Sequence, residues 1–211
     1  MKLHVIPAGM IQTNAYLLTD SARKEAVLID APGTIWSKIE SRLTDDGVEL
    51  TQLWITHGHW DHTQGGAEVL RQTRAEAIAH QADQVLIETP EVMEGLMGER
   101  LGLEGISVNR WVKARDTLQA LGHTFEVRHV PGHCPGNVLF WCPELQAAFV
   151  GDAIFQSSIG RTDLPGGSFE ELERSIREQI YTLPDDTLLY PGHGASTTVA
   201  AEKKGNPHVR P

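Results

Sequence analysis

Four side chains of the kind that bind metal ions lie close together in the segment Thr56–His62: His57, His59, Asp61 and His62. A chance match to the pattern His-x-His-x-Asp-His is expected roughly 0.001 times in a chain of this composition. Three histidines on one turn would also make a poor core, because each buried ring has polar nitrogens that need partners. The segment therefore predicts a metal site.

Three more residues of this kind, His133, Asp152 and His193, each follow a glycine at the end of a predicted strand. Taken singly, such a histidine is more often an ordinary polar residue than a metal ligand. Together with the first four they give seven ligands. Seven are too many for one tetrahedral zinc, but they suit two metal ions that share a bridging carboxylate.

Strands must position these residues. Residues 51–56 are apolar and β-branched, which predicts a buried strand, and a helix is expected over about 64–74. The first cluster therefore lies on the loop that leaves a strand's C-terminal end, where α/β proteins commonly build their sites. The other three residues follow strands predicted over 125–130, 146–150 and 187–190. We expect all four strand ends to converge on one sheet edge.

The remaining pattern alternates strands and helices in two rough halves. Ser168 and Glu171 form a capping box that begins a helix reaching residue 180, and Thr34 is expected to cap a helix through Leu43. Residues 89–115 are rich in glycine and predict an irregular insertion, either a substrate flap or a plain surface connection. Other strands are expected over 2–6, 15–19, 25–30, 76–79, 117–120 and 137–142, and helices over 81–88 and from about 196.

This order predicts a mixed α/β (α+β) fold of two packed sheets with helices outside, in a single domain over 1–211. The chain has 211 residues, of which 40% are apolar, and no apolar run approaches the length of a membrane span. Two cysteines and no secretory signal favour a reducing cytoplasm. The net charge of −10 argues against a nucleic-acid partner, and no membrane partner is expected.

The ligand pattern resembles that of metallo-β-lactamase-fold hydrolases over nearly the whole chain. This resemblance implies a four-layer αββα sandwich with the metal site at one edge of the two sheets. It implies one metal ion on His57, His59 and His133, a second on Asp61, His62 and His193, and Asp152 bridging both. Zinc is the metal most members of the family bind, and iron or manganese is the alternative. Asp61 and Asp152 are the implied catalytic carboxylates, and a metal-bridging hydroxide is the implied nucleophile.

The segments Gly151–Phe155 and Gly160–Leu164 are similar to those of short, single-domain glyoxalase II-type enzymes, the hydroxyacylglutathione hydrolases. That subgroup hydrolyses S-lactoylglutathione-type thioesters, so a small thioester, of glutathione or of another thiol, is the expected partner. Only 18 residues follow His193, so no C-terminal helical domain is expected. Both a monomer and a homodimer remain open.

Two other functions remain open at this stage. The segment Gly160–Asp163 also occurs in persulfide dioxygenases of the same fold, which hold a single iron on two histidines and an aspartate, here His57, His133 and Asp152. A non-enzymatic metal or redox protein is disfavoured, because the full ligand set suits the activation of water and no flavin domain is present.

Several neighbouring residues are secondary candidates. Arg161 is expected either to bind a substrate carboxylate or to fix its loop through Asp163, and Trp60 either to line the pocket or to pack. Cys134 is interpreted as a space-filling residue or a redox-sensitive thiol beside the site. Asp30 and Asn14 match positions that support the metal ligands in similar proteins.

Overall fold

The computed structural model describes residues 1–211, which form two compact units. Unit 1 comprises Met1–Val112 and Ala120–Gly122, and unit 2 comprises Lys113–Gln119 and His123–Pro211. The prediction that these residues behave as a single domain stays a prediction. None of the helices combines the length and the apolar composition that crossing a bilayer requires.

The sheet of unit 1 has six strands in sequence order: β1 (Lys2–Ala8), β2 (Thr13–Asp20), β3 (Glu25–Ile29), β4 (Glu49–Trp54), β5 (Glu76–His80) and β6 (Arg110–Val112). The first three pair antiparallel, and β3 to β6 pair parallel. Strands β2 and β3 are buried almost throughout.

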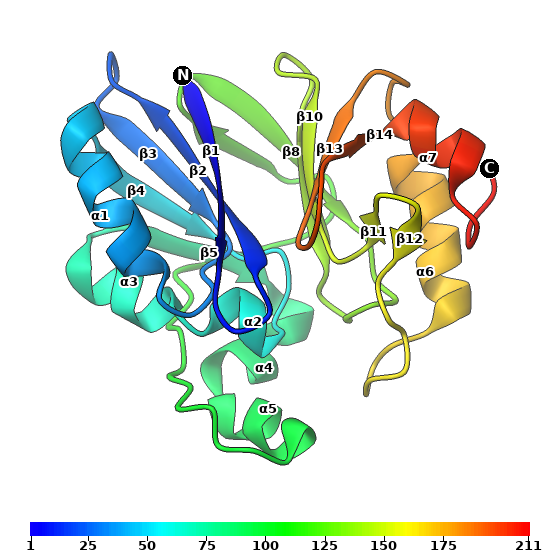
Figure 1. The fold of residues 1–211 in the computed structure, drawn as a ribbon, viewed down its shortest axis with the longest axis horizontal. Helices are drawn as coiled ribbons and strands as arrows, with labels where there is room; N and C mark the ends of the chain where they lie inside the picture. Colours follow the sequence, from blue (N-terminus) through cyan, green and yellow to red (C-terminus); the bar gives the residue numbers. More distant parts are fainter. The chain divides into compact units, whose positions relative to one another are not determined.

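Two helices cover one face of this sheet. Helix α1 (Ile35–Asp46) places Ile35, Ile39 and Leu43 in a core with strand residues such as Leu28, and α3 (Gly66–Gln72) adds Val69. Figure 1 shows both helices on the same side of the strands. The spacing of four residues between the buried positions of α1 is the apolar stripe that predicted this helix.

The remaining helical elements of unit 1 are short: α2 (Trp60–Thr63), the 3₁₀ turn η1 (Gln81–Asp83), α4 (Gln84–Glu88) and α5 (Pro90–Met97). The expectation of an irregular segment over 89–115 was wrong in part, since it contains both α5 and β6. Proline at the first position of α5 suits a helix start, and Gly98 ends the helix in the left-handed conformation. Strand β6 exists because β5 offers it a pairing edge.

Thr34 lies at the predicted start of α1, but its side chain makes no capping hydrogen bond. Its backbone is left-handed, with a φ of 65°, whereas a capping side chain requires an extended residue. The expected capping role of Thr34 was therefore wrong, although the helix begins where predicted.

Unit 2 also contains a six-stranded sheet, in the order β14-β13-β10-β9-β8-β7. Its strands are β7 (Thr117–Ala120), β8 (His123–His129), β9 (Val138–Cys142), β10 (Ala147–Gly151), β13 (Leu188–Pro191) and β14 (Thr197–Thr198), and β11 (Ile154–Phe155) and β12 (Ser158–Ile159) form a separate hairpin. Strands β10 and β13 are parallel, so their C-terminal ends lie side by side.

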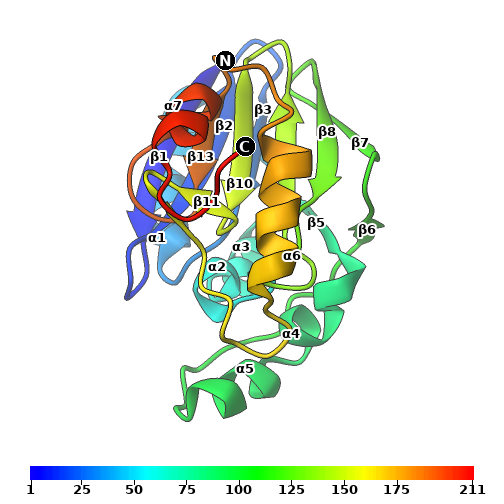
Figure 2. The same cartoon turned by 90° about the vertical axis from the view of Figure 1, so that its right-hand side faces the viewer.

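Helix α6 (Phe169–Ser175) covers this second sheet and continues into a π-helical turn, Ile176–Ile180. Leu172, Ile176 and Ile180 pack against strand residues such as Val150, and α7 (Val199–Gly205) adds Val199 to the same core. Figure 2 shows α6 alongside these strands. The predicted capping box is confirmed at its first bond, because the Ser168 side chain accepts a hydrogen bond from the Glu171 amide.

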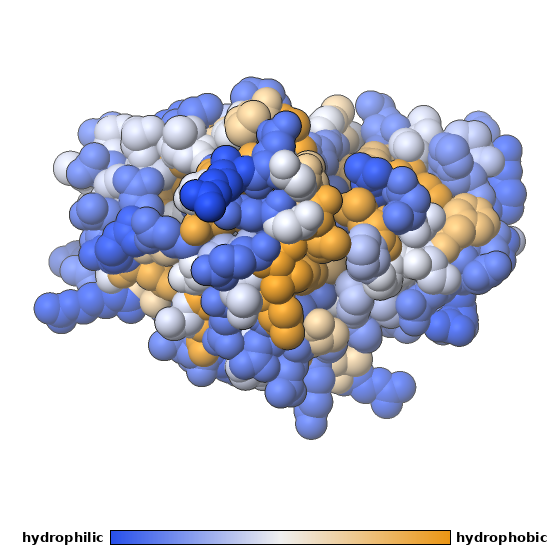
Figure 3. Space-filling model, turned by 90° about the horizontal axis from the view of Figure 1, so that it is seen from below, coloured by the Kyte–Doolittle hydropathy of each residue, from blue (hydrophilic) through white to orange (hydrophobic).

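In the view of Figure 3, hydrophilic residues cover most of the molecule and apolar residues form smaller patches. The most exposed large apolar side chains include Met10 in the turn between β1 and β2, and Val85 on α4.

Candidate metal centre

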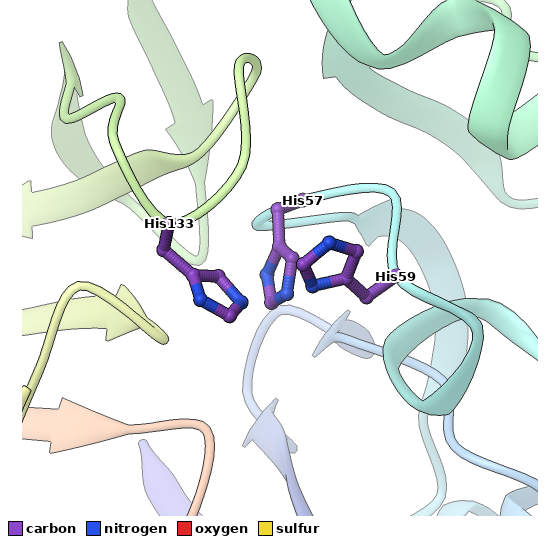
Figure 4. Close-up of side chains that lie close together, drawn as sticks. All are labelled: His57, His59 and His133. Carbon is purple, nitrogen blue, oxygen red and sulfur yellow. The ribbon is translucent and has the colours of Figure 1, made fainter. Parts of the chain in front are cut away.

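The loop that follows β4 carries His57 and His59, and α2 carries Asp61 and His62. All four side chains are buried, although Asp61 and His59 keep a small accessible surface. Figure 4 shows the rings of His57 and His59 side by side on this loop. Their centroids are 4.7 Å apart. Unit 1 therefore gathers three imidazoles and one carboxylate within a six-residue stretch.

A buried carboxylate fixes the ring of His62. The Nδ1 atom of His62 lies 2.7 Å from Oδ2 of Asp30, a residue that is 1% exposed. Because a carboxylate accepts and does not donate, Nδ1 carries the proton and the Nε2 lone pair of His62 is left for a metal ion. Asp30 directly follows β3 with a left-handed φ of 59°, a conformation that aspartate tolerates better than most residues.

Thr56 connects this carboxylate to His57. The Thr56 amide donates to Asp30 Oδ1 over 2.7 Å, and its hydroxyl donates to Asp30 Oδ2 over 2.8 Å. Since the single hydroxyl proton is used there, the Thr56 oxygen must accept from His57 Nδ1, which is 3.1 Å away. The proton of His57 is therefore also on Nδ1, and its Nε2 atom is set as a ligand.

A hydrogen bond from strand β2 holds the side chain of Asp61 in place. The hydroxyl of Thr13, in β2, donates to Oδ2 of Asp61 over 2.7 Å, and this oxygen lies 3.3 Å from Nε2 of His62. A carboxylate oxygen and an imidazole lone pair at this separation are placed as two ligands of one cation would be.

Unit 2 gathers three ligand-type residues at the C-terminal ends of its strands: His133 after β8, Asp152 after β10 and His193 after β13. The Nε2 atoms of His133 and His193 lie 3.6 and 3.5 Å from the same oxygen, Oδ2 of Asp152. The parallel pairing of β10 with β13 brings Asp152 and His193 together. His133, shown in Figure 4, is 3% exposed, whereas the side chain of His193 is 28% exposed.

Backbone groups orient His133. Its Nδ1 atom donates to the carbonyl oxygen of Arg161 over 2.8 Å, which again leaves Nε2 as the ligand atom. The preceding Gly132 has a φ of 122°, and a Cβ there would lie 2.2 Å from the Leu172 amide nitrogen. Only glycine therefore permits this approach of the loop to α6.

Gly160 brings the Arg161 carbonyl to its position. A Cβ on Gly160 would lie 1.9 Å from the carbonyl oxygen of Asp152 and 2.8 Å from Nδ1 of His133. Any side chain would thus separate the loop from the two metal-type residues. The packing within unit 2 therefore explains why the sequence motif has glycine at position 160.

The side chain of Arg161 pairs with Asp163 through two hydrogen bonds, of 2.7 and 2.8 Å. The guanidinium lowers the pKa of the Asp163 carboxyl to about 2, and the carboxylate raises the pKa of Arg161. Both side chains are largely exposed. The pair therefore closes its own turn, which is the loop-fixing alternative for Arg161, and its role toward a substrate stays a prediction.

The other secondary candidates are buried. Trp60 lies in α2 and is 8% exposed, Asn14 lies in β2, and Cys134 directly follows His133 without measurable exposure. The supporting roles of Thr13, Thr56 and the Arg161 carbonyl were missed from the sequence. A hydroxyl or a carbonyl that supports a ligand has no distinctive spacing in a sequence. Only the position of Thr56, directly before His57, could have indicated such a role.

The chemistry of these residues fits divalent metal ions. Three of the five histidines have their protons fixed on Nδ1 by carboxylate, hydroxyl or carbonyl acceptors, and two carboxylates lie against histidine Nε2 atoms. Imidazole and carboxylate together suit zinc, iron and manganese, and this ligand set alone does not choose among them.

Comparison with known proteins agrees with this reading. Residues 8–193 match the model of the metallo-beta-lactamase superfamily. The chain is 37% identical to the hydroxyacylglutathione hydrolase GloC of Haemophilus influenzae, over 99% of this chain and 98% of that protein.

Solved structures give the same result. The crystal structure of the BLEG-1 B3 metallo-beta-lactamase superposes with a TM-score of 0.90 at 32% identity, covering 98% of both chains. That of TTHA1623 in a di-iron-bound form gives 0.84 at 31% identity, covering 97% of this chain and 98% of the other. The predicted α/β fold with two sheets and helices is therefore confirmed. The chain belongs to the metallo-β-lactamase superfamily and shares the metal-dependent hydrolase fold of that family.

Proposed function

We propose that this protein is a glyoxalase II-like thioesterase that hydrolyses S-lactoylglutathione-type thioesters. The observation that carries the proposal is the orientation of His57, His62 and His133, whose Nδ1 atoms each have an acceptor so that their Nε2 lone pairs remain for metal ions. The similarity to a hydroxyacylglutathione hydrolase over nearly the full chain supports the thioester as substrate. The proposed setting is the cytoplasm, with neither nucleic acid nor membrane as partner.

The ligand residues of the two units together are proposed to bind two divalent cations. One would be held by His57, His59 and His133, the other by Asp61, His62 and His193, with Asp152 as the shared carboxylate. Zinc is our first assignment. The di-iron form of a similar protein makes iron the first alternative to test.

Two bound cations would supply Lewis acidity, making water a nucleophile near neutral pH and polarising the thioester carbonyl. The residues of the chain position the reactants. Thr13 fixes the carboxylate of Asp61, which is proposed to orient the attacking water by accepting a hydrogen bond from it.

The reaction does not require a proton donor for the leaving group. Attack on the acyl carbon breaks the carbon–sulfur bond, and the sulfur leaves with the bonding electrons as a thiolate. A thiol has a pKa of about 8.5, so its anion leaves readily without protonation. A thioester therefore suits a site whose polar groups are arranged for metal binding and water orientation.

The first experiment measures metal content per chain and S-lactoylglutathione hydrolysis on the same purified sample. Two equivalents of metal with thioester hydrolysis would support the proposal. One equivalent of iron, no thioesterase activity and oxygen uptake with glutathione persulfide would replace it with the dioxygenase alternative. Metal binding without either activity would support the metal site but refute the proposed thioesterase activity.

A pair of histidine variants provides the matched control. His133→Ala removes a proposed ligand, and we expect it to lower kcat/KM by more than about 100-fold and to reduce the bound metal. His129→Ala removes a ring four residues earlier that donates to the Pro135 carbonyl, and it should leave the metal content unchanged. Equal losses in both variants would show that His133 has no special role.

A further inference from the structure

A second group of metal-type side chains lies in unit 2, at the other ends of the strands that carry the first group. His123 begins β8, whereas His133 follows the end of that strand, so a seven-residue strand of about 20 Å separates them. The ligand atoms of His123, Cys142 and Glu144 all lie within 4.8 Å of one another. None of these three residues has a part in the proposed hydrolysis.

Strand pairing holds the group together. Strands β8 and β9 are antiparallel with Glu126 opposite Trp141, so the start of β8 lies near the end of β9 and the turn that follows it. The Nδ1 atom of His123 lies 2.5 Å from Oε2 of Glu144. Glu144 lies in the turn between β9 and β10, and this hydrogen bond joins the turn to the first residue of β8.

The sulfur of Cys142 lies beside the turn that joins β9 to β10. The segment after it, Cys142-Pro143-Glu144-Leu145, turns back so that the successive amides of Glu144 and Leu145 both donate to the sulfur. Consecutive amides aimed at one atom form the kind of concavity that surrounds metal-bound thiolates in iron–sulfur sites. The turn is closed by the Gln146 amide, which donates to the Pro143 carbonyl over 3.1 Å.

The exposure of the three residues suits entry of an ion from solvent. Cys142 is fully buried, whereas the side chains of His123 and Glu144 are 27% and 60% exposed. The buried sulfur would therefore form the floor of a site, and the imidazole and carboxylate would close it from the solvent side. Burial raises the pKa of the Cys142 thiol, so a cation must displace a proton on binding.

We propose that His123, Cys142 and Glu144 form a separate binding site for a thiophilic divalent cation of the zinc class. Sulfur, imidazole and carboxylate are all ligands of zinc, with bond lengths of about 2.0–2.3 Å. The hydrogen bond between His123 and Glu144 must open for both groups to reach these distances. Three protein ligands leave the fourth tetrahedral position open to water or a small ligand.

The site can be tested because it is the one that contains sulfur. The proposed hydrolytic residues are histidines and aspartates, so a cobalt–thiolate charge-transfer band reports only a cation bound at a cysteine. We would titrate cobalt into the full-length, metal-loaded protein. The expected result is a thiolate band that saturates at one equivalent, is retained in Cys134→Ser and is absent in Cys142→Ser.

Two variants at exposed positions keep the test valid if Cys142→Ser fails to fold. His123→Ala and Glu144→Gln should each weaken cobalt binding, measured by the same band, by more than about tenfold. The absence of the band in the wild-type protein would overturn the proposal, as would a band that survives in Cys142→Ser. Unchanged affinity in both His123→Ala and Glu144→Gln would also overturn it.

Discussion

Asp30 offers the most direct test of how the chain prepares its metal ligands. Replacing it by asparagine keeps its size but puts an amide group where the carboxylate Oδ2 accepts from both Thr56 and His62. The amide oxygen can still accept from the Thr56 backbone. The new NH₂ group faces Nδ1 of His62, and two donors cannot share a hydrogen bond.

His62 would respond by moving its proton to Nε2, where it blocks the lone pair needed for a metal ion. Loss of such an outer partner typically weakens metal binding by about 10–100-fold, which corresponds to about 1.4–2.8 kcal/mol. The metal-free protein should also become less stable, because hydrogen bonds to a buried charge contribute about 1.5–3 kcal/mol each. A domain of ordinary stability, about 5–15 kcal/mol, would still fold.

The assay is calorimetric titration of zinc into the metal-free protein, together with thermal unfolding of the same samples. Asp46→Asn is the matched control, since it makes the same charge change in the same unit. Asp46 accepts from Thr19 and Lys2 and has no contact with a proposed ligand. We expect zinc binding to weaken in Asp30→Asn and to stay unchanged in Asp46→Asn.

One result would refute this reasoning. If Asp30→Asn binds zinc with the wild-type affinity and stoichiometry while its unfolding temperature falls, Asp30 supports the fold but does not set the proton on His62. A fall in zinc affinity in both aspartate variants would instead indicate a general effect of the lost negative charge.

Two further predictions concern unit 2. Gly160→Ala should lower metal binding and stability, because its Cβ would lie 1.9 Å from the carbonyl oxygen of Asp152. The control is Gly95→Ala, at an open position in α5, which should stabilise the protein by about 0.5–1 kcal/mol in thermal unfolding. Equal effects of the two substitutions would contradict the steric explanation. Burial, followed by the charge of Glu202, raises the pKa of Tyr181 to about 12, so its contribution to stability is present below pH 10 and is lost as the pH rises toward 12. Tyr181→Phe, which lacks the hydroxyl bond to the Val209 carbonyl, should therefore lose less stability than the wild type over that pH range in chemical unfolding.

The sequence predicted those parts of the fold that depend on local pattern. The strand before His57 was expected over 51–56 and is found as β4 over Glu49–Trp54, followed by the histidine loop. The helix after Ser168 begins at its predicted cap. The apolar pattern of the strand and the capping residue of the helix each act within one element, so no knowledge of distant residues was needed.

The parts that were missed depend on contacts between distant residues. Strand β6 has only three residues and exists by pairing with β5. The Arg161 carbonyl that orients His133 belongs to a residue singled out for its side chain, and every residue has a carbonyl. Tertiary packing decides such contacts, and a single sequence carries no pattern for them. The ligand assignment to each metal stays a prediction.

The π-helical turn after α6 has a consequence for insertions and deletions. Its wider turn hydrogen-bonds the Tyr181 amide to the Ile176 carbonyl, five residues back, over 2.9 Å. Such turns hold one residue more than an α-helical turn. Deleting one residue within 177–179 would restore an ordinary α-helical turn and leave the residues after it in place, whereas deleting one residue within α6 would rotate everything after it by about 100°. Only the deletion within α6 would turn the Tyr181 hydroxyl away from the Val209 carbonyl, so a one-residue deletion should be tolerated better in the π-helical turn than in α6.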